Sequence, residues 1–310
     1  MKLFASIDEF KSEKKSVLTL GTFDGVHIGH KKIIDRLIQS AADEQCESVV
    51  LTFFPHPRMV LQDAAEILLL NTIDERADLL EKSGLDSLIV HPFDKAFSRL
   101  TAEEFIRVIL VDKLQIHKII IGYDHRFGRN RTANIDDLVE FGNQYGFEVE
   151  QISAKELDDV SVSSTKIRRA LQNGDVALAT AYLGYDYPLT GTVVEGRKLG
   201  RTLGYPTANI RIPENYKLIP KDGVYVVKST IDGRQIGGMM NIGINPTIED
   251  ANRSIEIYFI DFDADLYGRE LQVSLLHRLR DEQKFESLDL LKQQLAEDEL
   301  QSRAFLNSVL

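Results

Sequence analysis

Alternating strand and helix patterns in the first 183 residues constrain the fold of this chain most. Short apolar runs typical of buried strands lie at residues 17–20, 48–53, 87–91, 118–121 and 147–152. Helical patterns lie at residues 30–44, 74–83, 102–113, 134–145, 164–173 and 176–183. Such alternation predicts a mainly parallel sheet with helices on both faces. Ligands of such sheets bind beyond the carboxyl ends of the strands, so functional residues are expected there.

The pattern changes near Gly184, which predicts a second domain. From Gly191 onward, short β-branched segments alternate with Gly, Pro and Asn turns, at residues 190–194, 223–229, 237–242, 255–262 and 271–279. Several short strands with frequent turns indicate an antiparallel barrel or sandwich. Leu288, Leu291 and Leu295 then recur at helical spacing and predict a C-terminal helix. We therefore expect one domain over residues 1–184 and another over residues 185–310.

Composition narrows the class of protein. The chain has 310 residues, which is long enough for two cores. It has no run of about 20 apolar residues, and no apolar signal-peptide core follows Met1. The single cysteine, Cys46, excludes an internal disulfide and a cluster of cysteine metal ligands. A net charge of −11 without a basic stretch argues against nucleic-acid binding. These features predict a cytoplasmic enzyme with no membrane or nucleic-acid partner; weak self-association stays open.

The segment from Gly21 to His30 predicts a phosphate-binding turn. It follows the first apolar run and precedes the first helical pattern, so it lies where a strand leads into a helix. Backbone N–H groups and the positive end of a helix dipole point at the ligand in such a turn. Gly29 lets the backbone approach a ligand closely, since it has no Cβ. His27 and His30 add hydrogen-bond donors that suit a phosphoryl group.

Three further segments carry polar groups near predicted strand ends or helix starts. Pro55 and Pro57 fix the backbone around His56, after the second strand. Residues 122–131 form a loop with glycine and arginine after the fourth strand, a composition that can hold nucleotide phosphates. Residues 163–168 predict a helix start with a serine or threonine cap.

These segments together resemble a known family. His27-x-Gly29-His30 resembles the signature of the nucleotidyltransferase superfamily, which transfers AMP from ATP. The fuller run Gly-x-Phe-Asp-Gly-Val-His-x-Gly-His resembles the adenylyltransferase half of the bacterial bifunctional riboflavin kinase/FAD synthetases. The loop Gly-Tyr-Asp-x-x-Phe-Gly and the run Ser-Ser-Thr-x-Ile-Arg resemble two further motifs of that family. The resemblance implies a Rossmann-like domain in which the phosphate of FMN attacks the α-phosphorus of ATP and pyrophosphate leaves.

The resemblance also implies roles for individual residues. It makes His27 and His30 the catalytic residues and places the flavin against His56 and Pro57. It assigns the binding of ATP and its phosphates to Gly21, Phe23, Asp24, Gly29, Asp124, Ser164, Thr165 and Arg168.

One loop departs from the family pattern. The family usually has glycines where this chain has Asn130 and Ala133. Asparagine tolerates positive φ, whereas alanine does not. The shape of the loop and the role of Arg131 therefore stay open.

A second motif that indicates function is the glycine-rich segment at residues 191–209. Its glycines and cationic residues suit a polyphosphate, and it lacks the Walker pattern. It resembles the riboflavin kinase motif Gly-x-x-x-Gly-Arg-x-Leu-Gly-x-Pro-Thr-Ala-Asn, which implies a barrel-shaped kinase domain. The resemblance assigns ATP binding to Gly196, Gly200, Arg201, Gly204, Pro206, Thr207 and Asn209. Thr207 and Asn209 would also hold Mg²⁺, a hard cation that prefers oxygen ligands.

Glu256 is the expected general base of the second domain. Riboflavin offers a neutral hydroxyl, so its phosphorylation benefits from a base. Ile255 and Ile257 flank Glu256 in a strand pattern and face the opposite side of that strand, and Glu256 matches the catalytic glutamate of the family. Arg280 and Glu282 resemble the family segment that leads into the last helix near the flavin.

The resemblance covers most of the chain and predicts a bifunctional enzyme. It would phosphorylate riboflavin to FMN and adenylylate FMN to FAD, with ATP as co-substrate and Mg²⁺ as cofactor. One alternative is a kinase whose first domain no longer turns over because its loop is altered. The other is a flavin- or nucleotide-binding regulator without catalysis. Formation of FMN without FAD would identify the first alternative, and flavin binding without turnover the second.

Overall fold

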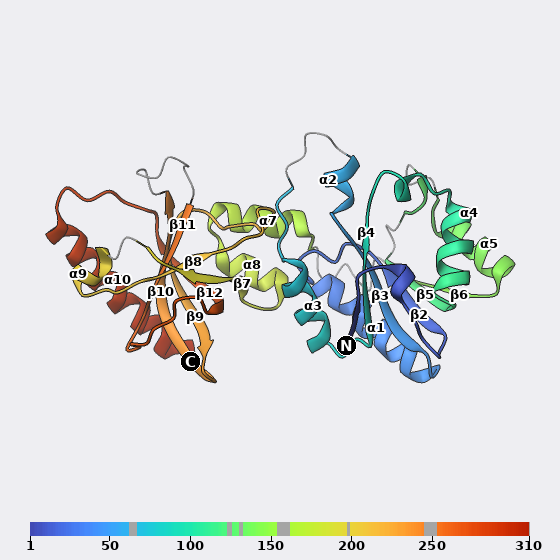
Figure 1. Cartoon of the computed structure of the whole chain (residues 1–310), viewed down its shortest axis with the longest axis horizontal. Helices are drawn as coiled ribbons and strands as arrows, with labels where there is room; N and C mark the ends of the chain where they lie inside the picture. The colour runs from blue at the N-terminus through green and yellow to red at the C-terminus, as the bar shows by residue number, and fades with distance from the viewer. Residues whose placement is uncertain are drawn as a thin grey trace. The chain divides into compact units, whose positions relative to one another are not determined.

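The computed structural model describes residues 1–61, 67–122, 126–129, 133–153, 162–196, 199–244 and 253–309. The chain forms two compact units, Met1–Ser163 and Ser164–Leu310, each built on its own sheet (Figure 1).

A six-stranded parallel sheet forms the centre of the first unit. Its strands are β1 (Lys2–Phe4), β2 (Ser16–Leu20), β3 (Glu47–Phe54), β4 (Ser87–Pro92), β5 (Ile116–Gly122) and β6 (Glu148–Ile152). They lie in the order β1-β4-β3-β2-β5-β6, and all neighbours are parallel. The expected parallel sheet is confirmed. The edge strand β1 escapes sequence prediction because three residues show no periodicity.

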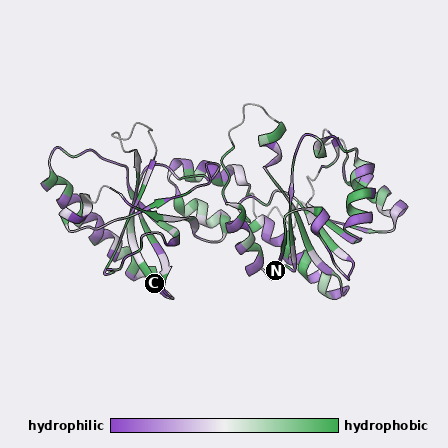
Figure 2. Ribbon diagram, in the orientation of Figure 1, coloured by the Kyte–Doolittle hydropathy of each residue, from purple (hydrophilic) through white to green (hydrophobic). Residues whose placement is uncertain are grey.

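Helices cover both faces of this sheet. The helical segments are η1 (Ile7–Glu9), α1 (Ile28–Asp43), α2 (Pro57–Leu61), α3 (Ile73–Lys82), η2 (Phe97–Arg99), α4 (Ala102–Glu104), η3 (Phe105–Lys113) and α5 (Ile135–Tyr145). Successive residues of a strand point to opposite faces, so Val17 packs with α1 and α3 while Leu18 packs with η3 and α5. Figure 2 shows hydrophobic residues along the central strands and many hydrophilic residues on the helices.

Local capping fixes several helix starts. Thr72 with Glu75 and Thr101 with Glu104 form capping boxes at α3 and α4. Residues 102–113 are helical as expected, but only the first three are α-helical. The segment η3 that follows is π-helical, and it ends where the Leu114 N–H donates to the Ile109 carbonyl at 3.0 Å.

A closed antiparallel barrel forms the second unit. Its strands are β7 (Tyr187–Val194), β8 (Ala208–Arg211), β9 (Gly223–Ile231), β10 (Arg234–Ile244), β11 (Arg253–Phe259) and β12 (Glu270–Arg280). The barrel order is β10-β11-β8-β7-β12-β9. Of the two expected architectures, the barrel is therefore the one found. Strand β8 begins at the end of the glycine-rich segment 191–209, where no strand was expected.

Helix α10 (Leu288–Val309) packs against the barrel, which confirms the expected C-terminal helix. Gly237 in β10 makes room for it, since a Cβ at this position would lie 2.4 Å from Leu306 Cδ1. The ring of His277 in β12 stacks on Phe305 with centroids 4.9 Å apart.

Helices α7 (Ser164–Asn173) and α8 (Val176–Leu183) belong to the second unit by their contacts. The Lys221 N–H donates to the Leu171 carbonyl at 3.0 Å, and α8 contacts β12. A functional division at residue 184 stays a prediction. Within the described part of the chain, no helix is both long enough and apolar enough to cross a membrane.

Candidate functional site

The turn from Gly21 to His27 lies at the carboxyl end of β2, in the middle of the sheet. Strand β2 pairs with β3 on one side and β5 on the other, so the turns after these strands share one edge. His56 follows β3 at the same edge. Ligands of parallel α/β sheets bind at this edge, so the structure brings the first group of predicted residues to the expected place.

The backbone of this turn has a rarely used conformation. Phe23, Gly25 and Val26 have φ angles of 46°, 89° and 32°. Positive φ is costly for a bulky or β-branched residue, so the surrounding structure must hold it. Phe23 and Val26 are both buried, and the Val26 N–H donates to the Phe23 carbonyl at 3.0 Å. Strain of this kind clusters at binding and active sites.

His27 is the N-cap of α1. Its Nδ1 accepts a hydrogen bond from the backbone N–H of His30 at 3.3 Å, and the two rings stack with centroids 3.6 Å apart. Because Nδ1 is the acceptor, neutral His27 carries its proton on Nε2, which is then a donor. A Cβ on Gly29 would lie 3.3 Å from the His27 ring, so glycine gives this ring room. The sequence does not predict this capping role, because Ser, Thr, Asp and Asn are the usual caps.

Burial keeps both imidazoles neutral at pH 7. It lowers the pKa of His27 to about 4, although the Asp24 carboxylate acts in the opposite direction. Burial, together with the nearby His27 and Arg76, holds the pKa of His30 well below its ordinary value. His30 Nδ1 is also buried and has no hydrogen-bond partner among the described residues. Preorganised imidazole groups at a helix N-terminus are suited to stabilising a phosphoryl group.

Acid is expected to destabilise the first unit through His27. The ordinary pKa of histidine is 6.5, whereas the pKa of folded His27 is about 4. Between these values the unfolded state binds more protons, so the free energy of unfolding falls as the pH is lowered from 6.5 towards 4. His27→Gln should flatten this dependence, which urea unfolding at a series of pH values would measure. An unchanged pH dependence in the variant would contradict the prediction.

Asp24 anchors the strained turn from inside the protein. Its carboxylate is 1% exposed and accepts hydrogen bonds from the N–H groups of Leu70 at 2.9 Å and Asn71 at 3.3 Å. It also lies 3.6 Å from the guanidinium of Arg76, a buried residue of α3. Arg76 donates to the hydroxyl of Thr52 in β3 at 3.4 Å. Arg76 has no sequence signal of its own, because a charged residue near a helix start usually faces solvent. A direct contact of Asp24 with ATP stays a prediction.

Arg76→Met is expected to lower the free energy of unfolding by about 3–5 kcal/mol, because it leaves a buried carboxylate without its cation. Urea unfolding followed by circular dichroism would measure the loss. The double variant Asp24→Asn/Arg76→Met should recover part of it, since no uncompensated charge then remains. A single variant as stable as the natural chain would show that the pair does not hold the turn.

The loop after β3 is fixed around His56, as the sequence predicts. His56 is 9% exposed, and its Nδ1 accepts a hydrogen bond from the Arg58 N–H at 3.1 Å. Pro57 begins α2, and proline suits a first helical position. Contacts of the flavin with His56 and Pro57 stay predictions.

The loop after β5 is described in part. Asp124, Asn130 and Arg131 lie outside the described residues. Ala133 is buried, and its backbone bridges that of Phe127 through hydrogen bonds of 3.2 and 3.3 Å. Alanine is readily accommodated in an extended bridge of this kind.

Helix α7 carries the predicted phosphate ligands Ser164, Thr165 and Arg168. It begins at Ser164, as expected, and Arg168 is half-buried. The helix belongs to the second compact unit, whereas the turn from Gly21 to His27, here called the histidine turn, belongs to the first. A joint contact of these two groups with ATP therefore stays a prediction.

Three oxygen-bearing side chains meet on, or directly before, the barrel strands β8 and β11. Glu256 lies in β11 directly opposite Asn209 in β8. Thr207, just before β8, donates its hydroxyl to the Glu256 carboxylate at 3.3 Å. Ile255 and Ile257 are buried, as the alternating pattern predicts. The structure thus brings together the predicted base and the two predicted magnesium ligands, and their hydroxyl, amide and carboxylate oxygens fit a hard cation.

The glycines of this motif allow close approach of the chain. A Cβ on Gly196 would lie 2.1 Å from Asn209 Nδ2, and one on Gly200 would lie 2.2 Å from the Tyr205 carbonyl oxygen. Gly204 has a φ of 87° and follows the short helix α9 (Leu199–Leu203). Larger side chains at residues 196 and 200 would therefore force the Asn209 side chain and the Tyr205 backbone to move.

Arg280 fastens α10 to β12. Its Nε and Nη2 donate to the carboxylate of Asp298 at 2.9 and 2.7 Å, and Asp298 is buried. Glu282 is exposed, as are Arg201 and Pro206 near the glycine motif. Flavin binding by Arg280 and Glu282, and ATP binding by Arg201 and Pro206, stay predictions.

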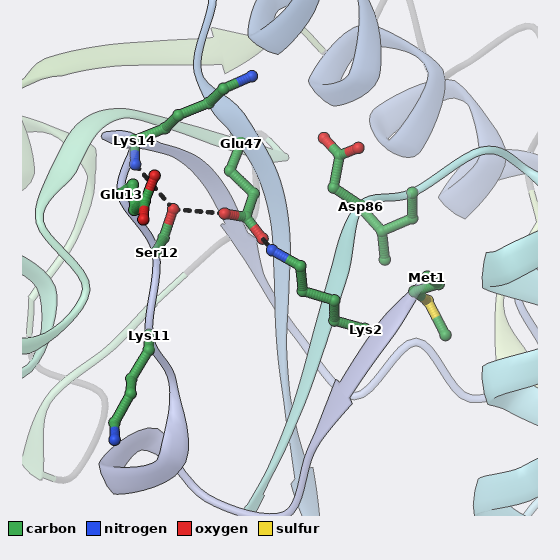
Figure 3. A pocket seen from close by; sticks show the side chains of 9 residues that line it. Met1, Lys2, Lys11, Ser12, Glu13, Lys14, Glu47 and Asp86 are labelled. Carbon is green, nitrogen blue, oxygen red and sulfur yellow. Dashed lines mark hydrogen bonds and ion pairs between the residues drawn. The ribbon is translucent and has the colours of Figure 1, made fainter.

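A hollow of about 810 Å³ lies at the opposite edge of the first sheet, near the amino ends of its strands (Figure 3). It is lined by Met1, Lys2, Lys11, Ser12, Glu13, Lys14, Glu47, Leu85 and Asp86. The Glu47 carboxylate on its wall accepts hydrogen bonds from Ser12 and, at 3.4 Å, from Lys2. This hollow is therefore separate from the turn that carries His27.

Comparisons with known proteins assign the two parts of the chain to two different families. The model of the FAD synthetase family matches residues 9–166, and that of the riboflavin kinase family matches residues 183–306. A relative from Listeria monocytogenes is 38% identical, over 96% of this chain and 94% of its own length. Another from Escherichia coli is 36% identical, over 98% of each chain. Both are named bifunctional riboflavin kinase/FMN adenylyltransferase.

A solved structure from Streptococcus pneumoniae shares the complete fold. It is described as a macrolide-efflux protein and is 32% identical to this chain. The superposition covers 97% of this chain and 98% of the other, with a TM-score of 0.88. From the two family matches and the full-length relatives, this chain belongs to the bifunctional riboflavin kinase/FMN adenylyltransferase family.

Proposed function

We propose that this chain converts riboflavin to FMN and FMN to FAD with ATP, at two separate sites. The proposal rests on the observation that each unit contains its own group of candidate catalytic side chains. The first unit has two neutral, stacked histidines at a helix N-terminus. The second unit has Glu256 beside Thr207 and opposite Asn209. Membership of the family supports both activities.

Phosphorylation of riboflavin takes place in the second unit. Glu256 accepts the proton of the riboflavin hydroxyl as its oxygen attacks the γ-phosphorus of ATP, and ADP leaves. Thr207 positions the carboxylate through its hydroxyl, at 3.3 Å. Thr207 and Asn209 would hold Mg²⁺, which neutralises phosphate charge when bound.

Adenylylation of FMN takes place at the turn of the first unit. The 5′-phosphate of FMN attacks the α-phosphorus of ATP, and pyrophosphate leaves. The nucleophile is already an anion, so the site must position it and stabilise charge rather than remove a proton. Nε2 of His27 and the N-terminus of α1 donate hydrogen bonds to the phosphates. Ser164, Thr165 and Arg168 are the proposed ligands of the β- and γ-phosphates.

A time course with riboflavin, ATP and magnesium tests the proposal. FMN should appear first and FAD second when the products are separated by chromatography. FMN without FAD would mean that the first site is silent and would favour the kinase alternative. Flavin binding without any product would favour the regulator. A cytoplasmic location, weak self-association and the absence of nucleic-acid partners remain predictions from the sequence.

A further inference from the structure

A glutamate, a cysteine and a histidine meet near the amino ends of the strands of the first sheet, away from the histidine turn. Glu44 is the C-cap of α1, Cys46 lies just before β3, and His117 lies near the start of β5. One ligand atom from each of the three lies within 4.8 Å of the other two. Neither proposed reaction uses these residues.

The backbone after α1 fixes the positions of Glu44 and Cys46. Gln45 has a φ of 53°, its N–H donates to the Ala42 carbonyl at 3.3 Å, and the Cys46 N–H donates to the Ala41 carbonyl at 2.9 Å. These two bonds form a Schellman motif, which normally places glycine at the left-handed residue. The turn holds Glu44 and Cys46 close together at the end of the helix.

A β-bulge brings His117 to the same place. Ser16 of β2 pairs with Ile116, whereas the next residue, Val17, pairs with Lys118, so His117 is an extra residue in β5. Bulges re-aim side chains. As a result, His117 and the adjacent Lys118 both reach the Glu44 carboxylate.

The His117 ring and the Glu44 carboxylate lie close together without a hydrogen bond between them. His117 Nε2 lies 3.0 Å from Glu44 Oε2. Nevertheless, Oε2 is shielded from solvent and has no hydrogen-bond partner among the described residues. The two atoms are thus close without the alignment that a hydrogen bond needs. The other oxygen, Oε1, is bound by Lys118, which fixes the carboxylate and leaves Oε2 available.

We propose that Glu44, Cys46 and His117 form a binding site for Zn²⁺, with water as the fourth ligand. Thiolate, imidazole and carboxylate are the ligands that Zn²⁺ takes in proteins. Around a tetrahedral Zn²⁺, ligand atoms lie about 3.3–3.6 Å apart, given Zn–S bonds of about 2.3 Å and Zn–N or Zn–O bonds of about 2.0–2.1 Å. In the present structure the three ligand atoms lie within 4.8 Å of one another. Side-chain rotations that move these atoms by about 1 Å would bring them to the distances that Zn²⁺ requires.

The proposed site joins the end of α1 to β5. Helix α1 has 16 residues and is therefore about 24 Å long. Its other end carries His27, so a bound ion would fasten the helix at the end remote from the catalytic turn.

Titration of the reduced, chelator-treated full chain with Co²⁺ tests the site. Excess Mg²⁺ is included to occupy sites made only of hard oxygen ligands. Co²⁺ bound at this site should give one equivalent of a thiolate-to-cobalt charge-transfer band, which can only come from Cys46 because the chain has a single cysteine. Zn²⁺ should displace Co²⁺ and abolish the band.

Matched variants make the test specific. Cys46→Ser should lose the band. His117→Gln should weaken binding at least tenfold, since losing even an outer-shell partner costs about 10–100-fold. His277→Gln replaces a histidine outside the proposed zinc site and should bind Co²⁺ with the affinity of the natural chain. Absence of the band in the folded natural chain would overturn the proposal. Equal Co²⁺ affinity in the natural chain and in His117→Gln would also overturn it.

Discussion

Glu256→Gln is expected to lower the rate of FMN formation from riboflavin by about 10²–10⁴-fold, the usual contribution of a general base. Glutamine keeps the size of the side chain and can still accept the hydrogen bond from Thr207, so the barrel should fold. Conversion of added FMN to FAD should continue at the natural rate, because that reaction belongs to the first unit. Separate assays from riboflavin and from FMN would measure both rates.

The control for Glu256 is Glu270→Gln. Glu270 is an exposed glutamate at the start of β12, and its replacement should change neither rate. Equal loss of both activities in Glu256→Gln would argue against two independent sites. Full FMN formation in that variant would remove Glu256 from the mechanism.

His30→Ala is expected to have the reverse effect. Loss of one preorganised donor at a site of developing charge costs about 10²–10³-fold in rate, so FAD formation from FMN should fall by that amount. The substitution also removes the ring that stacks on His27, so part of the loss should come from a less well positioned His27. FMN formation from riboflavin should be unchanged and serves as the internal control. Loss of FMN formation in a folded His30→Ala chain would contradict this division of labour.

The order of elements was predictable because strand and helix periodicities are local properties of the sequence. Secondary-structure elements were missed where the local signal is short, as in the three residues of β1, or where another sequence pattern dominates. Ala208 and Asn209 of β8 belong to a glycine-rich motif, so the pairing of Asn209 with Glu256 in β11 appears only in the barrel. The π-helical part of residues 102–113 has the apolar content of an ordinary helix, and the sequence does not distinguish the two.

Residues of the candidate sites were predictable from the sequence only where they belong to a short motif. His27 and His30 lie in one short run, which identifies them together. Asp24 and Arg76 are 52 positions apart, and only tertiary packing makes them a pair. The meeting of Cys46 with His117 depends on a left-handed Gln45 and a bulge, and neither feature has a sequence signature here.

The two sheets differ in what they offer to another polypeptide. A closed barrel has no free edge, whereas the open sheet ends in β1 and β6. Exposed edges invite another strand unless they are short or charged. Strand β1 has three residues and an exposed Lys2, while β6 carries Glu148 and Glu150. Both ends of the open sheet therefore resist strand addition, and any self-association of this chain is expected to use helices or loops.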